Sequence, residues 1–155
     1  MAVIISAAGI KKGITLSEYV SYLQNISLFV REYRRCIVYC EYTVQKIISD
    51  YSSRKECPEF IINCSKLLKE EDFPTAWSKS VDEDKKLNKS DKTLMIDLGA
   101  CLGSGDKNTQ INSLDYIIDC IELSLSKSRE IEKSDKKLYT VIGFSIGLLV
   151  LIMTI

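Results

Sequence analysis

Histidine is absent from this chain of 155 residues, and proline occurs only twice. The absence of histidine removes the commonest general base and the commonest metal ligand, and it leaves serine and cysteine without an imidazole to activate them. The formal net charge is zero, so no overall field attracts nucleic acid. We therefore expect a protein that is not an enzyme, needs no cofactor, and binds neither nucleic acid nor a small-molecule substrate.

Helix breakers are scarce, because long stretches contain neither proline nor glycine. We expect an all-α fold, a compact multi-helix cytoplasmic bundle whose long last helix continues into a C-terminal transmembrane helix. The predicted helices are 17–39 and 43–51, either separate or continuous, then one opened by Pro58, one from Thr75 to about Glu83, 90–102, and one from Lys107 onward.

The first long helix carries an apolar seam with alternating steps of three and four residues, which is typical of one helix face. Ser17 is a plausible N-cap for it, and Thr43 for a second helix. The seam has two interpretations: it packs on its own domain, or it forms a coiled coil with another chain. It consists of Leu16, Tyr19, Leu23, Ile26, Val30, Tyr33, Ile37, Cys40, Val44, Ile47 and Tyr51.

Six cysteines are present but no C-x-x-C motif, and their spacings match no common zinc pattern. A cytoplasmic body keeps its thiols reduced, so we expect buried structural thiols. The alternative is a thiol sensor or a metal site that pairs Cys36 and Cys40 with Cys57 and Cys64. The other two cysteines are Cys101 and Cys120.

The segment around residues 98–110 combines small residues with a helix start. Gly99 and Gly103 lie four apart, a spacing that lets another helix approach closely. Ser90 is the expected N-cap of the helix that contains Gly99. Asp106 is expected to cap the next helix, with its carboxylate bonded to the amide of Asn108 or Thr109.

The end of the chain, 138–155, has no charged residue. A helix of this length spans ~27 Å, close to the hydrocarbon thickness of a bilayer, so we expect a transmembrane anchor; the alternative is a buried core helix. Its hydroxyls are expected to bond back to helix carbonyls. Gly143 and Gly147 form a small-x-x-x-small pair suited to helix association, or they are neutral for packing. Lys133, Lys136 and Lys137 flank the anchor and predict a cytoplasmic body.

Four regions follow from these patterns: a short apolar segment 1–12, a helical cytoplasmic domain 13–126, a charged helical stalk 127–137 and the transmembrane helix 138–155. The apolar segment is too short to cross a bilayer as a helix. It has three interpretations, namely a segment that dips into the membrane interface, a remnant of a longer anchor, and a frayed hydrophobic end.

A constellation in the carboxyl half resembles the stage III sporulation protein AB family. Its residues are Leu98, Gly99, Leu102, Gly103, Asp106 and Gln110, followed by a long helix and an anchor that begins Leu138-Tyr139 and contains Gly143 and Gly147. Ala76-Trp77 and the helix after Pro58 agree in order, and the resemblance covers about residues 20–155. Two departures are the absence of a full membrane-spanning helix at the start and Val44 in place of the proline that usually follows Thr43.

The resemblance implies a component of the channel assembly that links mother cell and forespore in endospore-forming bacteria. The family is similar to the inner-membrane platform protein of type II secretion and type IV pilus machines. By that analogy the protein lies in the mother-cell membrane and engages a cytoplasmic secretion-type ATPase and other channel subunits. The alternative function is a tail-anchored tether that self-associates or pairs through the 16–51 seam.

Overall fold

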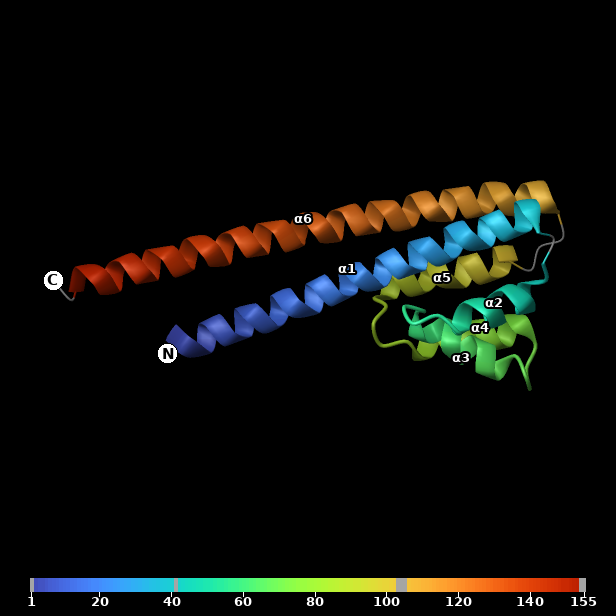
Figure 1. Cartoon of the computed structure of the whole chain (residues 1–155), viewed down its shortest axis with the longest axis horizontal. Helices are drawn as coiled ribbons and strands as arrows, with labels where there is room; N and C mark the ends of the chain where they lie inside the picture. Colours follow the sequence, from blue (N-terminus) through green and yellow to red (C-terminus); the bar gives the residue numbers. More distant parts are fainter. Residues whose placement is uncertain (1, 41, 103–105, 154–155) are drawn as a thin grey trace. The chain divides into compact units, whose positions relative to one another are not determined.

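The computed structural model describes the backbone of residues 2–40, 42–102 and 106–153, whereas the side chains of residues 2–15, 136, 139, 143 and 146–153 lie outside the described residues. All regular structure within these ranges is helical, which confirms the all-α prediction (Figure 1). The helices are α1 (Ala2–Tyr39), α2 (Val44–Ser52), α3 (Glu59–Leu67), α4 (Phe73–Glu83), α5 (Lys89–Leu102) and α6 (Lys107–Met153).

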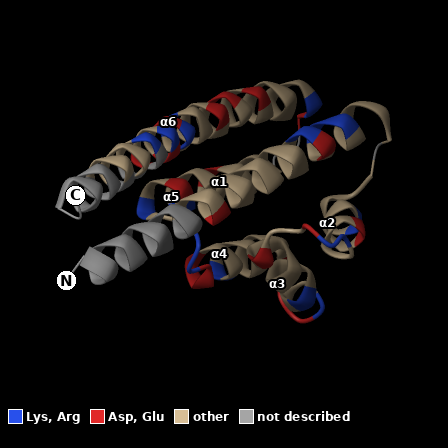
Figure 2. Ribbon diagram, turned by 60° about the vertical axis from the view of Figure 1, so that its left-hand side comes forward, with Lys and Arg blue, Asp and Glu red and all other residues tan. Residues whose placement is uncertain are grey.

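The chain divides into two units, and both long helices contribute to each. One unit contains Met1–Ser21 and Ser124–Ile155, and the other contains Tyr22–Leu123. In the second unit, hereafter the helical body, α1 lies beside α6, and α2, α3 and α4 lie on the other side of α1 (Figures 1 and 2). Successive short helices of the body pack on one another, α2 on α3, α3 on α4 and α4 on α5.

The apolar seam of α1 lies inside the helical body. The seam residues Ile26 and Val30 are fully buried, and Tyr33 and Ile37 nearly so. The ring of Phe29 contacts Tyr51 of α2 edge to face, with centroids 4.9 Å apart. The body section of the seam therefore packs on its own chain, the first of the two interpretations.

The start of α1 differs from the prediction. The helix begins at Ala2 rather than near Ser17, because residues 2–15 contain no proline and Gly9 and Gly13 are tolerated within a helix. The predicted break after Tyr39 is present. The Thr43 hydroxyl accepts a hydrogen bond from the amide of Lys46, which caps α2 although Val44 rather than a proline follows Thr43.

The cap of α5 was placed two residues too late. The amide of Asp91 donates to the side-chain oxygen of Asn88 at 2.8 Å, so Asn88 rather than Ser90 performs this role. Asparagine and serine are both good N-cap residues, and the sequence places one at each position. The choice between them depends on how the connection from α4 packs.

The last part of α6 contains the predicted anchor. Among the residues that the structure describes, no helix carries an apolar stretch long enough to cross a membrane. Most side chains of 138–155 lie outside the described residues, as does that of Lys136, and the surroundings of Gly143 and Gly147 are likewise not described. The transmembrane helix is therefore unconfirmed. The hydroxyl of Ser145 donates to the carbonyl of Val141 at 2.9 Å, as predicted for this segment.

Candidate functional site

At Gly99 of α5 the side chain of Trp77 from α4 lies against the helix backbone. A Cβ atom at this position would lie 2.2 Å from Cδ1 and 2.5 Å from Nε1 of Trp77, far inside van der Waals contact. The indole of Trp77 thus fills the space that any other residue at position 99 would occupy. The predicted close neighbour of Gly99 is a side chain of α4, and Gly103 lies outside the described residues.

Trp77 is held in this position by polar and aromatic contacts. Its Nε1 donates to the carbonyl of Met95 on α5 at 2.7 Å. The ring of Phe60 meets the indole edge to face at 5.4 Å, and Phe73 lies 5.6 Å away. Because buried indole N–H groups need an acceptor, the Met95 bond fixes the orientation of the ring.

The last backbone carbonyls of α5 accept hydrogen bonds from a side chain of the next helix. Nε2 of Gln110 donates to the carbonyl of Leu102 at 2.8 Å and to that of Cys101 at 3.2 Å. The hydroxyl of Tyr33 donates to the same Leu102 carbonyl at 3.3 Å. These bonds pair carbonyls that have no partner within the helix, so they join α5, α6 and α1 at one corner.

The start of α6 is capped by Asp106. Its Oδ2 accepts from the amide of Thr109 at 2.9 Å and from the hydroxyl of Thr109 at 2.7 Å. These hydrogen bonds to Thr109 lower the pKa of the Asp106 carboxyl below its ordinary value. Nζ of Lys107 donates to the carbonyl of Val38 at 3.2 Å near the end of α1. The corner therefore fixes where α1 ends and α6 begins.

Two arginines of α1 bind carboxylates of α6. Arg34 is bidentate to Asp115, with Nε–Oδ1 and Nη2–Oδ2 distances of 2.6 and 3.0 Å. Nη2 of Arg31 lies 3.0 Å from Oε1 of Glu122, which also accepts from the Ser27 hydroxyl. All these pairs are partly exposed, so they align the two helices rather than supply much stability.

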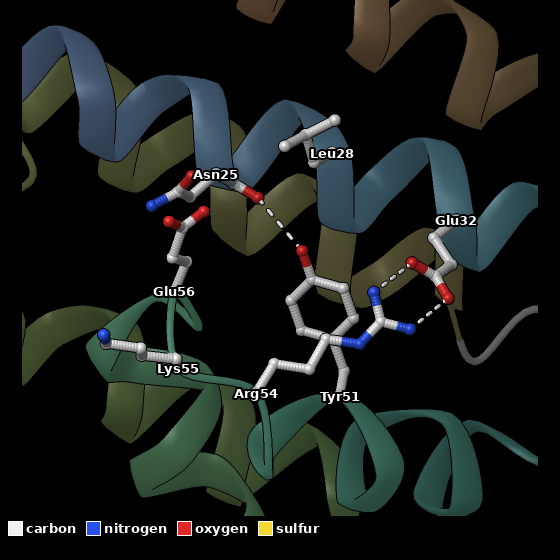
Figure 3. A pocket seen from close by; sticks show the side chains of 7 residues that line it. All are labelled: Asn25, Leu28, Glu32, Tyr51, Arg54, Lys55 and Glu56. Carbon is white, nitrogen blue, oxygen red and sulfur yellow. Dashed lines mark hydrogen bonds and ion pairs between the residues drawn. The ribbon is translucent and has the colours of Figure 1, made fainter.

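A hollow of about 340 Å³ lies between α1 and the segment that follows α2 (Figure 3). We call it the Leu28 hollow. Tyr51 donates a long hydrogen bond to the carbonyl of Asn25 across it, and Arg54 forms a bidentate ion pair with Glu32. The guanidinium of Arg54 also lies 4.7 Å from the centroid of the Tyr51 ring. The hollow is lined by Asn25, Leu28, Glu32, Tyr51, Arg54, Lys55 and Glu56.

Sequence reasoning missed this hollow, although one signal was available. Leu28 lies between the seam positions Ile26 and Val30 and therefore falls off the buried face of α1. A large apolar residue on the outer face, followed by the charged pair Arg31-Glu32, marks a partly covered surface. Arg54 lies on a loop, and helical periodicity does not predict which side chains a loop residue contacts.

Comparison with models of known protein families shows to which family the chain belongs. The family model described as stage III sporulation protein AB matches residues 1–155, the whole chain. The chain belongs to the stage III sporulation protein AB family. Membership assigns this family member a role in stage III of sporulation. No curated protein and no solved structure matches it.

The motif residues that carry the resemblance pack or cap helices in this AB family member. Leu98 and Leu102 are fully buried, Gly99 admits Trp77, Asp106 caps α6, and Gln110 pairs the end of α5. The motif residues therefore build the corner of the helical body.

The expectation of buried thiols holds for one cysteine of this AB family member. Cys64 is buried, whereas Cys40 is exposed and the other four are partly exposed. Burial raises the pKa of Cys64 to about 12 and that of Cys57 to about 11, which disfavours the reactive thiolate. Among the described residues, no group of three or more cysteine or acidic side chains is placed to hold a metal ion.

The lysines at the connection between α4 and α5 form an exposed surface. Lys85, Lys86 and Lys89 are all exposed, and Nζ of Lys86 lies 3.7 Å from Oε2 of Glu59. Beneath them Asp84 is buried; it accepts from the hydroxyl of Tyr22 and from the amide of Lys86. The buried carboxylate holds the connection against α1, so the lysines stand on a fixed backbone.

Proposed function

We propose that this protein is a non-enzymatic, membrane-anchored scaffold of the channel complex between mother cell and forespore. The family assigns the stage of sporulation, and the organisation of the chain supports the scaffold role. Its motif residues serve packing and capping, which suits a protein that presents a rigid helical body to other subunits. The body faces the cytoplasm of the mother cell, and the end of α6 lies in its membrane.

The observation that carries this proposal is the apolar surface near the end of α6. Leu138, Val141, Ile142 and Phe144 are all exposed large apolar side chains, and residues 138–155 include no charged side chain. Each such side chain gains roughly 1.5–3 kcal/mol on full removal from water. Exposed apolar side chains gathered in one segment favour a membrane or protein contact, and the flanking lysines favour a membrane.

The proposed partner is the cytoplasmic secretion-type ATPase of the channel, and the lysine surface after α4 is the proposed docking point. Lys85 and Lys86 lie on the short connection held by Asp84, and Lys89 is the first residue of α5. Basic side chains on a fixed backbone give orientation and a fast association rate with an acidic surface. Their partner surface on the ATPase is therefore expected to carry carboxylates.

A pull-down tests this proposal. The full chain, purified in detergent, is expected to retain the ATPase, and the triple variant Lys85→Glu, Lys86→Glu, Lys89→Glu is expected to lose it. The matched control reverses Lys66 and Lys69, two exposed lysines at the end of α3. Equal retention by the triple variant and the control would contradict the proposed docking surface, and no retention by the parent chain would contradict the partner.

A further inference from the structure

The positive charges that precede the uncharged end of α6 gather on one face of the helix. Arg129, Lys133 and Lys137 are all exposed and follow one another at steps of four residues. Side chains at this spacing are neighbours on a helix surface. We call these three residues the basic stripe. It covers about 12 Å of helix at about 1.5 Å per residue, and it ends where the uncharged segment 138–155 begins (Figure 2).

The carboxylates of the same part of α6 do not neutralise the basic stripe. Glu132 and Asp135 are half-buried, and one carboxylate oxygen of Asp135 is buried, so these two acids lie on the inward side of the helix. Glu130 is exposed, and it lies at the edge of the stripe, three positions before Lys133. The three cations of the stripe therefore face solvent beside a single exposed carboxylate.

Exposed cations of the helical body are engaged in a way that those of the basic stripe are not. Arg31, Arg34 and Arg54 each bind a carboxylate, and Nζ of Lys79 lies 3.0 Å from Oε1 of Glu71. Among the residues that the structure describes, no carboxylate lies within ion-pair distance of a cation of the stripe. The charges of the stripe are therefore available to a ligand outside the chain.

We propose that the basic stripe binds the headgroups of anionic phospholipids. The stripe leads directly into the exposed apolar side chains Leu138, Val141 and Ile142, so one lipid can place its phosphate on the cations and its acyl chains on these residues. The attraction between a basic side chain and an anionic membrane surface falls off within about 8 Å at physiological salt. Lys133 lies about 6 Å along the helix from Lys137, and long basic side chains extend toward the headgroups while their stems cover apolar surface.

The apolar continuation of the stripe favours a lipid over an acidic protein as the ligand. An acidic protein surface would match the three cations but would leave the neighbouring apolar side chains exposed to water, which is unfavourable. A membrane with anionic lipids covers both. This inference rests on the proposed membrane anchor and adds the class of lipid that the protein recognises, which an anchor alone does not require.

Native mass spectrometry of the full chain in an uncharged detergent tests the lipid class. Phosphatidylglycerol, which is anionic, and phosphatidylcholine, which has no net charge, are added in equal amounts with the same acyl chains, and bound lipids are identified by mass. We expect the parent chain to prefer phosphatidylglycerol about tenfold or more, because each basic residue near the headgroups adds to the attraction. The triple variant Arg129→Gln, Lys133→Gln, Lys137→Gln is expected to bind the two lipids within about twofold of each other.

A matched control removes three exposed lysines of the helical body, Lys55→Gln, Lys66→Gln and Lys69→Gln. The control loses the same charge as the triple variant and is expected to keep the preference of the parent chain. Equal binding of both lipids by the parent, the result expected if the stripe binds an acidic protein, would overturn the proposal, as would an equal loss of preference in the control. A chain that shows no lipid preference but resists carbonate extraction would contradict this inference and leave the anchor standing.

Discussion

Gly99 has no Cβ atom, and the indole of Trp77 occupies the space that the Cβ of any other residue would fill. Alanine would normally be preferred in a helix by about 1 kcal/mol over glycine. Here the added methyl group would push the indole away and break its bond to the carbonyl of Met95. Helix propensity therefore favours alanine at position 99 and packing favours glycine, and the packing contribution to stability is the larger one.

We predict that Gly99→Ala destabilises the protein by about 1–3 kcal/mol, the usual cost of overpacking a core. Urea unfolding of the full chain can be followed by the fluorescence of Trp77, the only tryptophan. Ala100→Ser is the control, because Ala100 is the exposed next residue of α5. An unchanged or raised stability of Gly99→Ala would mean that Trp77 does not occupy this position.

The thiols differ in a way that alkylation can measure. We predict that iodoacetamide at pH 8 modifies the exposed Cys40 within the folded protein and leaves Cys64 unmodified until urea unfolds it. Burial removes access to Cys64 and raises its pKa to about 12, so little thiolate is present. Peptide mass spectrometry gives the modified positions, and rapid native modification of Cys64 would contradict its burial.

The burial of Cys64 also predicts that the protein loses stability as the pH rises. The pKa of Cys64 is raised in the folded protein from an ordinary value of 9.0. The contribution of the neutral thiol to stability is therefore complete below about pH 9 and is lost as the pH rises toward 12. Cys64→Ala is expected to reduce this alkaline loss.

Among the elements, the packing of α1 distinguishes a helical body that packs on itself from a coiled coil with another chain. Its seam residues contact other helices of the body, for example the hydroxyl of Tyr33, which donates to the carbonyl of Leu102 on α5. Buried in this way, the body section of the seam has no free apolar face for a second chain. The ion pairs of Arg31 and Arg34 with α6 then align the helix within the body.

We therefore predict that Val30→Asp unfolds the helical body instead of only separating a dimer. An unpaired carboxylate at a fully buried position costs several kcal/mol, a large part of the stability of a small domain. Circular dichroism and sedimentation of the full chain in detergent distinguish the outcomes. A folded variant that has merely lost an oligomer would show that the seam pairs with another chain.

At the scale of the whole molecule, local chemistry was predictable and long-range packing was not. The cap at Thr43, the cap at Asp106 and the helix after Pro58 each depend on a few neighbouring residues, and sequence reasoning placed them correctly. The contact of Trp77 with Gly99 joins residues of two helices, so spacing alone indicated a close approach without naming the partner.

The same limit explains the site residues that were missed. Gln110 belongs to the family motif, but its bonds to the end of α5 depend on the turn between α5 and α6. The Leu28 hollow depends on the ion pair of Arg54 with Glu32, residues that lie 22 positions apart. Periodicity describes one helix at a time, and both features arise where separate segments meet.

Carbonate extraction of membranes from sporulating cells tests the central claim most directly. The account predicts that the full chain stays in the membrane pellet at high pH, because it proposes that the uncharged segment 138–155 inserts into the bilayer. A chain that ends at Lys137 is predicted to appear in the supernatant in the same experiment. Release of the full chain into the supernatant would contradict a membrane-anchored scaffold.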